Sequence, residues 1–165
     1  MPEVDLILAN TIRDYMGLDD TRVWLYNQNI DLPKDDAIFV IVATESRRIV
    51  SQVHRFDPDT DEQVQSSTMY TTLNVEITSR DESAKLRNYE VALSIESVIG
   101  QRYQEDNQIR MFRNGQILDL SAVDGASALH RYQIPIIISH VETKRTAITP
   151  IDKFQPTTTE VDKNG

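Results

Sequence analysis

Three aspartates in one short segment come nearest to a recognisable chemical site. Asp57, Asp59 and Asp61 occupy the first three ligand positions of a calcium-binding loop. Glu62 then stands where such a loop requires glycine, and Thr68 stands where it requires a bidentate glutamate. The segment is therefore expected to be an acidic, solvent-exposed turn that holds no metal.

The other side chains that could do chemistry form no recognised motif. The histidines are His54, His130 and His140, and the last two would lie roughly 30 Å apart along one strand, too far to share an ion. The sequence contains no Gly-x-Ser-x-Gly elbow and no glycine-rich phosphate loop. It predicts no catalytic residue, no metal and no cofactor. An enzyme with a carboxylate pair built from distant segments remains a weaker alternative.

Composition narrows the class of protein further. The 165 residues are enough for one domain with a buried core, and the absence of cysteine excludes disulfides and thiolate chemistry. A net charge of −9 argues against a nucleic-acid-binding face but suits a surface past which DNA slides without sticking. The longest apolar run, near residues 134–138, is too short to span a bilayer, and the N-terminus lacks the basic start of a signal peptide.

Periodicity places helices and strands around the acidic turn. Apolar residues at helical spacing predict a helix over residues 4–16, ended by Gly17. Residues 22–26 and 37–43 are expected to be strands, the second covered on both faces because it is apolar on both. Residues 47–56 and 63–79 are predicted to form a long hairpin around the acidic turn, since the second segment alternates apolar and polar side chains.

A long helix is predicted from Asp81 to about Glu105, with an unusually wide apolar arc. Its members are Tyr89, Val91, Ala92, Leu93, Ile95, Val98, Ile99 and Tyr103. So wide an arc must be covered from two directions, either by the sheet and the first helix or by the sheet and a neighbouring copy of the chain. Glu96 falls inside the arc and therefore needs a hydrogen-bonding or cationic partner.

The remaining segments complete the α+β prediction. Residues 109–120 are expected to form a hairpin around a type I′ turn at Asn114-Gly115, followed by a strand over 129–142 whose Pro135 requires an edge or a bulge. The expected fold is a mixed, mostly antiparallel sheet with a short N-terminal helix and one long helix packed on it. Residues 1–142 form the predicted domain. Residues 143–165 form a C-terminal arm, either disordered or ordered against a neighbour.

The order of these segments resembles the tail-terminator, or neck, proteins of tailed bacteriophages. The resemblance covers roughly residues 4–142 and rests on structural motifs in the same order. They are Leu6-Ile7-Leu8, Ile12-Arg13, Met16-Gly17-Leu18, Arg22-Val23-Trp24, Asn27-Gln28-Asn29, Leu32-Pro33, Arg87-Asn88-Tyr89-Glu90-Val91-Ala92-Leu93, the turn at Gly115 and Arg131-Tyr132-Gln133-Ile134-Pro135.

The resemblance implies a structural virion protein without catalytic residues. It implies a homo-oligomeric ring, usually a hexamer, located at the neck of the virion and assembled in the host cytoplasm. Its partners would be the tail tube protein and the head-closure or connector protein, with DNA passing through the lumen. A head-completion adaptor is one alternative, and a monomeric interaction module outside any virus is another. The predicted interface residues are Asp57, Asp59, Asp61, Glu62, Glu96, Ile148, Ile151 and Phe154.

Overall fold

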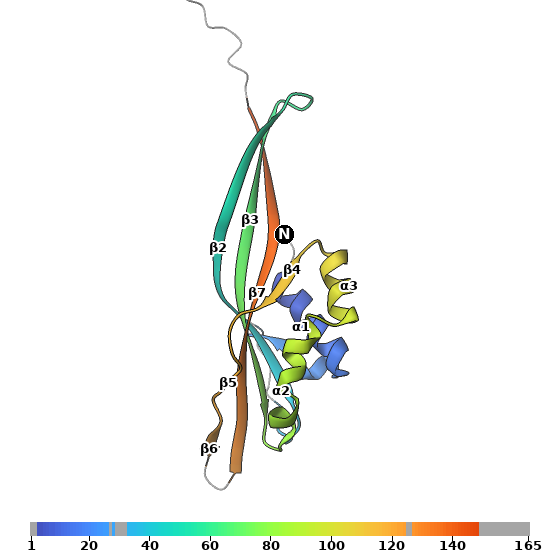
Figure 1. The fold of residues 1–165 in the computed structure, drawn as a ribbon, viewed down its shortest axis with the longest axis vertical. Coiled ribbons are helices and arrows are strands. Elements are labelled where there is room, and N and C mark those ends of the chain that lie inside the picture. Colours follow the sequence, from blue (N-terminus) through green and yellow to red (C-terminus); the bar gives the residue numbers. More distant parts are fainter. Residues whose placement is uncertain (1–2, 27, 29–32, 125–126, 149–165) are drawn as a thin grey trace, which may run out of the picture.

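A computed structural model describes residues 3–26, 28, 33–124 and 127–148. In these residues, helices cover one face of an elongated, twisted sheet (Figure 1). The predicted α+β class with a mostly antiparallel sheet is confirmed. The elements in chain order are α1 (Val4–Met16), a 3₁₀ turn (Asp20–Arg22), β1 (Val23–Leu25), β2 (Phe39–Asp57), β3 (Glu62–Ser79), α2 (Ser83–Ser94), α3 (Val98–Asp106), β4 (Arg110–Arg113), β5 (Leu118–Asp119), β6 (Ala122–Asp124) and β7 (Ser127–Ala147).

The sheet has the strand order β1-β2-β3-β7-β4, and β5 and β6 also pair with β7. Only β1 with β2 is a parallel pair among the strands described. The alternation that predicted β3 is confirmed, because its apolar side chains enter the core while their neighbours face away. The fully buried centre includes Leu8, Ile12, Val40, Val42, Leu73, Val75, Ile77, Val91, Ile136 and Ile138. None of the helices in the described ranges is long and apolar enough to cross a membrane.

The first hairpin is longer than predicted. The segments predicted as separate strands over 37–43 and 47–56 form one strand, β2, because bulges between Thr44 and Ser46 and between Ile49 and Ser51 absorb the irregular stretch. Helices cover only one face of this strand, so the prediction of cover on both faces is wrong. Phe39 and Ile41, on the helix-free face, are half-buried and line an open groove of about 280 Å³.

The first helix agrees with its prediction, and Gly17 ends it in the left-handed conformation, φ +64°. The predicted long helix is divided into α2 and α3. Ser97 caps α3, since its Oγ accepts a hydrogen bond from the Gly100 N–H at 3.0 Å. Gln104 then ties the junction to β4 by donating to the carbonyls of Ile95 (2.8 Å) and Gly100 (3.2 Å) and accepting from the Met111 N–H at 2.8 Å.

The predicted hairpin over 109–120 is wrong. β4 and β5 do not pair with each other, because both pair with β7 at successive positions along it. Gly115 has φ +99°, but Asn114 does not have the positive φ that a type I′ turn requires, and its N–H bonds to the Pro135 carbonyl at 3.0 Å. Pro135 lies between the stretches of β7 that pair with β4 and β5, which fits the predicted edge position.

Candidate assembly surface

The acidic side chains that the structure describes do not assemble into a metal centre. In the described residues, no group of three or more His, Cys, Asp or Glu side chains is placed to hold an ion. The acidic turn is instead joined to the end of β7. Arg145 Nη1 lies 3.3 Å from Asp57 Oδ2 and 3.2 Å from Glu62 Oε2, and the Ile148 N–H donates to the Asp61 carbonyl at 3.0 Å. The tip of the β2–β3 hairpin and the end of β7 therefore lie side by side.

Hydrogen bonding at the tip also changes its electrostatics. The backbone N–H of Asp59 and, secondarily, the guanidinium of Arg145 hold the pKa of Asp57 below its ordinary value. Sequence reasoning placed these carboxylates correctly in a turn but missed Arg145, which is 88 residues further along the chain. Residues 143–147, predicted as the start of the arm, are the last part of β7.

Of the other predicted interface residues, Glu96 lies apart from this tip. Glu96 has the cationic partner that it was expected to need, because Arg113 Nε lies 3.0 Å from its carboxylate. The expectation that Glu96 lies inside a covered arc is wrong, since its side chain is 57% exposed. Ile148 is exposed beside the acidic turn. Ile151 and Phe154 fall outside the described residues.

His140 is the histidine that the fold buries. Its side chain is 3% exposed, and Nε2 lies 3.2 Å from the Glu142 carboxylate two residues away, a same-face strand spacing that could have revealed the pair in the sequence. Within the described part of the chain, His140 Nδ1 and Thr71 Oγ1 are buried without a hydrogen-bond partner. His140 also lines a depression of about 430 Å³ with Gln104 and Arg110. This arrangement contains no nucleophile–base pair and gives no ground for assigning catalysis.

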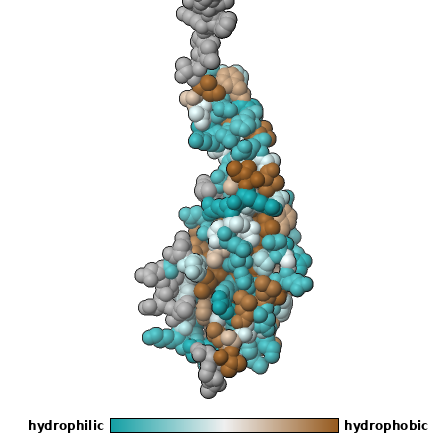
Figure 2. Space-filling view, turned by 90° about the vertical axis from the view of Figure 1, so that its left-hand side faces the viewer, coloured by the Kyte–Doolittle hydropathy of each residue, from teal (hydrophilic) through white to brown (hydrophobic). Residues whose placement is uncertain are grey.

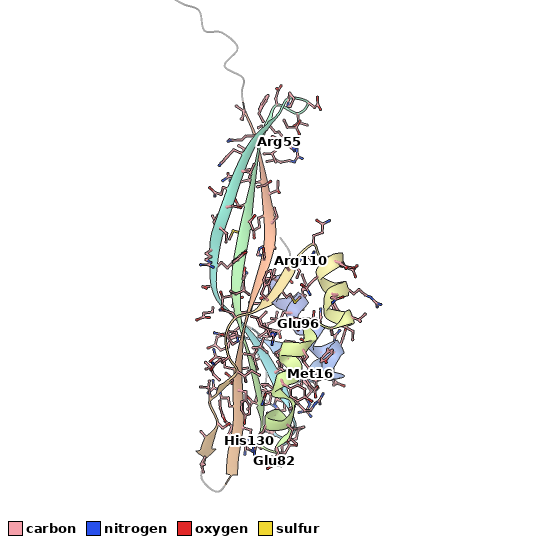
Figure 3. The ribbon with its side chains drawn as sticks, viewed as in Figure 1. Met16, Arg55, Glu82, Glu96, Arg110 and His130 are labelled. Carbon is pink, nitrogen blue, oxygen red and sulfur yellow. The ribbon has the colours of Figure 1, made fainter. Side chains whose placement is uncertain are left out.

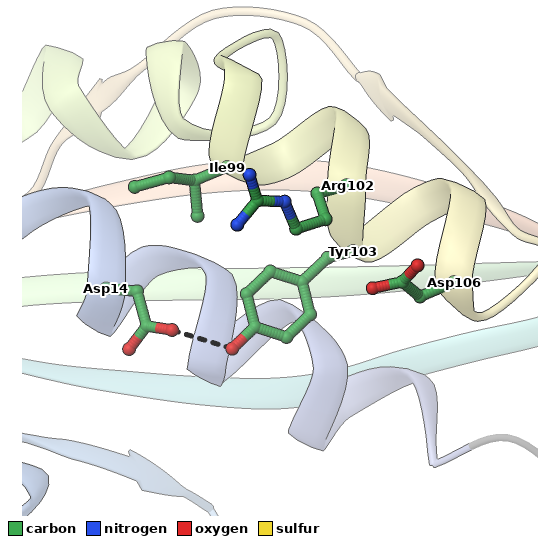
Figure 4. A pocket seen from close by; sticks show the side chains of 5 residues that line it. All are labelled: Asp14, Ile99, Arg102, Tyr103 and Asp106. Atoms are coloured by element: carbon green, nitrogen blue, oxygen red, sulfur yellow. Dashed lines mark hydrogen bonds between the residues drawn. The ribbon is translucent and has the colours of Figure 1, made fainter.

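A second depression, of about 390 Å³, lies between α1 and α3 (Figure 4). The Tyr103 hydroxyl donates to Asp14 Oδ2 at 2.6 Å, and Ile99, Arg102 and Asp106 complete the lining. This hydrogen bond is the main cause that lowers the pKa of Asp14, and it raises the pKa of Tyr103. The pair links the two helices, and Arg13 also donates to Asp14 Oδ1 at 2.8 Å.

Tyr103→Phe is expected to lower the free energy of unfolding by about 1 kcal/mol at neutral pH, a value already reduced for the partial exposure of the pair. Because the folded state lowers the pKa of Asp14, the stabilisation is present above the pKa of Asp14 in the unfolded chain and is lost as pH falls through its folded value. Urea unfolding should show a smaller difference between the variant and the wild type at pH 3 than at pH 7. An equal difference at both pH values would contradict an ionic origin.

The most unusual surface is the end of the sheet that extends past the helices (Figure 1). We define this extension as residues 49–57 of β2, 62–69 of β3 and 140–147 of β7, three antiparallel strands in register. In the described residues, no strand pairs with the outer edge of β2 or β7 along it. Figure 3 shows Arg55 near its tip, far from Glu82 at the opposite end of the molecule.

Apolar side chains are exposed on both faces of this extension. Residues directly opposite in antiparallel strands share a face, so Ile49 and Phe56 lie on the same side as the core residues of β3, which we call the helix-facing side. They are 55% and 53% exposed. Val53 and Val141 lie on the helix-free side and are 64% and 59% exposed. Figure 2 views the helix-free side and shows apolar patches from one end of the sheet to the other.

Comparisons with known proteins find no relative by sequence and a weak structural similarity. No family model matches the sequence, and no curated protein matches it. The structure is similar to the cryo-EM structure of the PVC sheath/tube terminator, in its extended state, of an extracellular contractile injection system. The TM-score is 0.40 and the sequence identity is 10%, and the match covers 100% of this chain. The chain spans 66% of the length of that terminator.

Proposed function

We propose that this chain is a structural subunit that assembles with copies of itself into a ring at the top of a phage tail tube. The ring, expected to be a hexamer, would stop growth of the tube and present a joining surface to the head-closure or connector protein. Its lumen would let DNA pass without binding it, which agrees with a net charge of −9. The proposal includes no catalytic step and no cofactor.

The observation that carries this proposal is the extension with exposed apolar side chains on both faces. A three-stranded sheet of this kind cannot form a core by itself, since each face needs another layer to exclude water. Clustered apolar surface of this type marks protein interfaces. The order of sequence motifs over residues 4–142, which resembles tail terminators, supports the specific kind of assembly.

Solution mass measured by light scattering across a concentration series tests the proposal. A ring-sized species is expected, either in the isolated protein or after addition of purified tail tube protein. A monomer at every concentration, unchanged by tube protein, would overturn the proposal and favour a monomeric interaction module. In purified phage particles, a label on this chain is expected at the head-proximal end of the tail tube. A label found elsewhere would exclude the terminator position.

Deletion of residues 149–165 is expected to weaken ring assembly while leaving the fold unchanged, because the segment contains Ile151 and Phe154 but lies beyond the last strand. Truncation from residue 149 keeps Arg145 and its contacts to the acidic turn. The matched control deletes residues 156–165 and retains both apolar side chains. Assembly that is equally strong in all three proteins would exclude a role for this segment.

A further inference from the structure

The outer edge of β7 changes from paired to open at His140. β6, β5 and β4 pair with this edge at residues 127–129, 132–133 and 136–139. Along residues 140–147 no strand in the described part of the chain continues that row. Every second residue of an antiparallel strand directs its N–H and C=O groups toward one edge, so this stretch presents backbone groups that an added strand could pair.

The outer edge of β2, on the other side of the extension, is less suited to receive a strand. Two bulges, at residues 44–46 and 49–51, interrupt β2, and bulges are a common device against pairing at an edge. In contrast, β7 pairs with β3 from His130 to Ala147 without a bulge. Of the two edges of the extension, the edge of β7 is therefore the regular one.

A depression marks the point where the open edge begins. It has a volume of about 430 Å³, lies where β4 starts, and is lined by Ile109, Arg110 and His140 among others. Figure 3 shows Arg110 at this point, where the helical layer meets the extension. The His140 side chain is 3% exposed, and its Nδ1 is buried without a hydrogen-bond partner among the described residues. A partner side chain seated in this depression would contact Ile109 and His140.

The chain itself contains a segment of the right length to occupy the edge. Residues 149–165 follow the last described residue of β7 and its flank, and within them the five residues Ile151–Gln155 stand between Pro150 and Pro156. Proline has no N–H to donate and is found at the ends of strands, so the two prolines delimit a short strand. Five residues fit along residues 140–147 without reaching the part of β7 that β4 occupies.

The side chains of this segment also match the edge. In an antiparallel pairing with Asp152 opposite Lys144, two opposite charges meet on the helix-facing side. Phe154 then lies on the same side and two residues closer to His140, where the depression can receive an aromatic ring. Ile151 lies on the helix-free side, where the extension also exposes apolar side chains.

We propose that residues 151–155 of one protomer add as a strand to the outer edge of β7, along residues 140–147, of a neighbouring protomer. In added strands of this kind, backbone hydrogen bonds supply affinity and side-chain pockets supply specificity. The proposal rests on the proposed ring and states what the segment after Ile148 does in it. Each protomer gives one strand and receives one, and a contact between such unlike surfaces propagates from copy to copy and closes into a ring when the rotation allows it.

The register favours a neighbour over the same chain. With Asp152 opposite Lys144 in one chain, residue 149 would pair with Ala147 and leave only Ile148 to reverse the chain. Tight hairpins need at least two residues for that reversal. The Ile148 N–H also donates to the Asp61 carbonyl at 3.0 Å, which continues the direction of β7. Return of the segment to its own β7 would therefore require a different register.

Cross-linking between singly substituted proteins tests the contact, because the chain has no cysteine of its own. Lys153→Cys protein is co-expressed with tagged Thr143→Cys protein, since the proposed register places these residues opposite each other, and the assemblies are treated with a short bis-maleimide. The matched control replaces Thr143→Cys with Ser51→Cys, which is also exposed and on the helix-free side but on β2. About tenfold more cross-linked heterodimer is expected from the test pair, because pairing holds the two cysteines at high effective concentration.

A double variant with Lys153→Cys and Thr143→Cys in one chain, mixed with an excess of wild-type protein, reports a return of the segment to its own β7. If wild-type protein assembles but the test pair links no better than the Ser51→Cys control, the strand contact between protomers is refuted and the ring proposal stands. A cross-link within the double variant would then identify the chain's own segment as the occupant. If wild-type protein is a monomer with and without tube protein, the ring proposal fails and this contact fails with it.

Hydrogen exchange gives a second reading that needs no cysteine. On assembly of wild-type protein, outward-facing amides within residues 140–147 are expected to exchange about tenfold more slowly, because an added strand accepts hydrogen bonds from them. In protein truncated from residue 149, the same amides should exchange fast at every concentration. Residues 136–139, which pair with β4 in both proteins, serve as the internal reference. Equal exchange along residues 140–147 in the two proteins would overturn the proposal.

Discussion

Gly100→Ala is expected to lower the free energy of unfolding by about 3 kcal/mol, the upper end of what overpacking a well-packed site costs. An added Cβ at Gly100 would overlap the carbonyl oxygen of Ser94 and would lie 2.8 Å from that of Ile95. Both obstacles are backbone atoms, so neither can rotate away as a flexible side chain would. The turn between α2 and α3 must then open and disturb the packing of both helices.

Gly17→Ala is the matched control for this substitution. Gly17 has φ +64°, but nothing lies within 4 Å of the position that a Cβ would take there, so the expected cost is only the backbone strain of about 1 kcal/mol. Thermal unfolding should therefore place Gly100→Ala clearly below Gly17→Ala, at roughly 2–4 °C per kcal/mol for a chain of this size. Equal midpoints for the two variants would show that the close approach at Gly100 is not essential to the fold.

The double variant Ile49→Asp and Phe56→Asp is expected to abolish self-association without lowering monomer stability. Both side chains are more than half exposed in the single chain, so the monomer loses little. Covered by a neighbour, each would contribute about 2 kcal/mol, and losing about 4 kcal/mol weakens association roughly a thousandfold. Light scattering and circular dichroism on the same samples separate the two effects.

Gln116→Asp serves as the control for added charge, because Gln116 is exposed and lies outside the extension. It should assemble as the wild type does. If the double variant also keeps its assembled mass, the helix-facing side of the extension takes no part in the ring. If it unfolds, Ile49 and Phe56 stabilise the monomer, and the extension is not the free surface that its exposure indicates.

Much of the fold follows from local patterns in the sequence. Alternation along residues 63–79 predicted β3 and its buried face, and Gly17 predicted the end of α1, because both signals depend on neighbours within a few residues. The break between α2 and α3 was missed although Ser97 and Gly100 lie at it, since apolar spacing continues through the junction. The acidic turn was likewise predicted from its composition.

Pairing between distant strands could not be predicted in this way. Asn114-Gly115 has the composition of a hairpin turn, yet β4 and β5 each pair with β7 and not with each other. Pairing with the long edge of β7 stabilises both strands more than a hairpin would, because β5 has only two residues to pair with β4. The partner of Asp57 is Arg145, which no local pattern connects to it.

The sequence by itself determined which faces of the strands and helices are apolar, because that property repeats with the period of each element. Only the tertiary structure decided which of those faces have cover. Ile49 and Phe56 lie on the same sheet face as the buried residues Leu73, Val75 and Ile77 of β3, but the helical layer ends before it reaches them. The lengths of α2 and α3 and the break between them at Ser97 determine how far the helical layer reaches along the sheet. Where these helices lie on the sheet depends on packing between segments that are far apart in the chain.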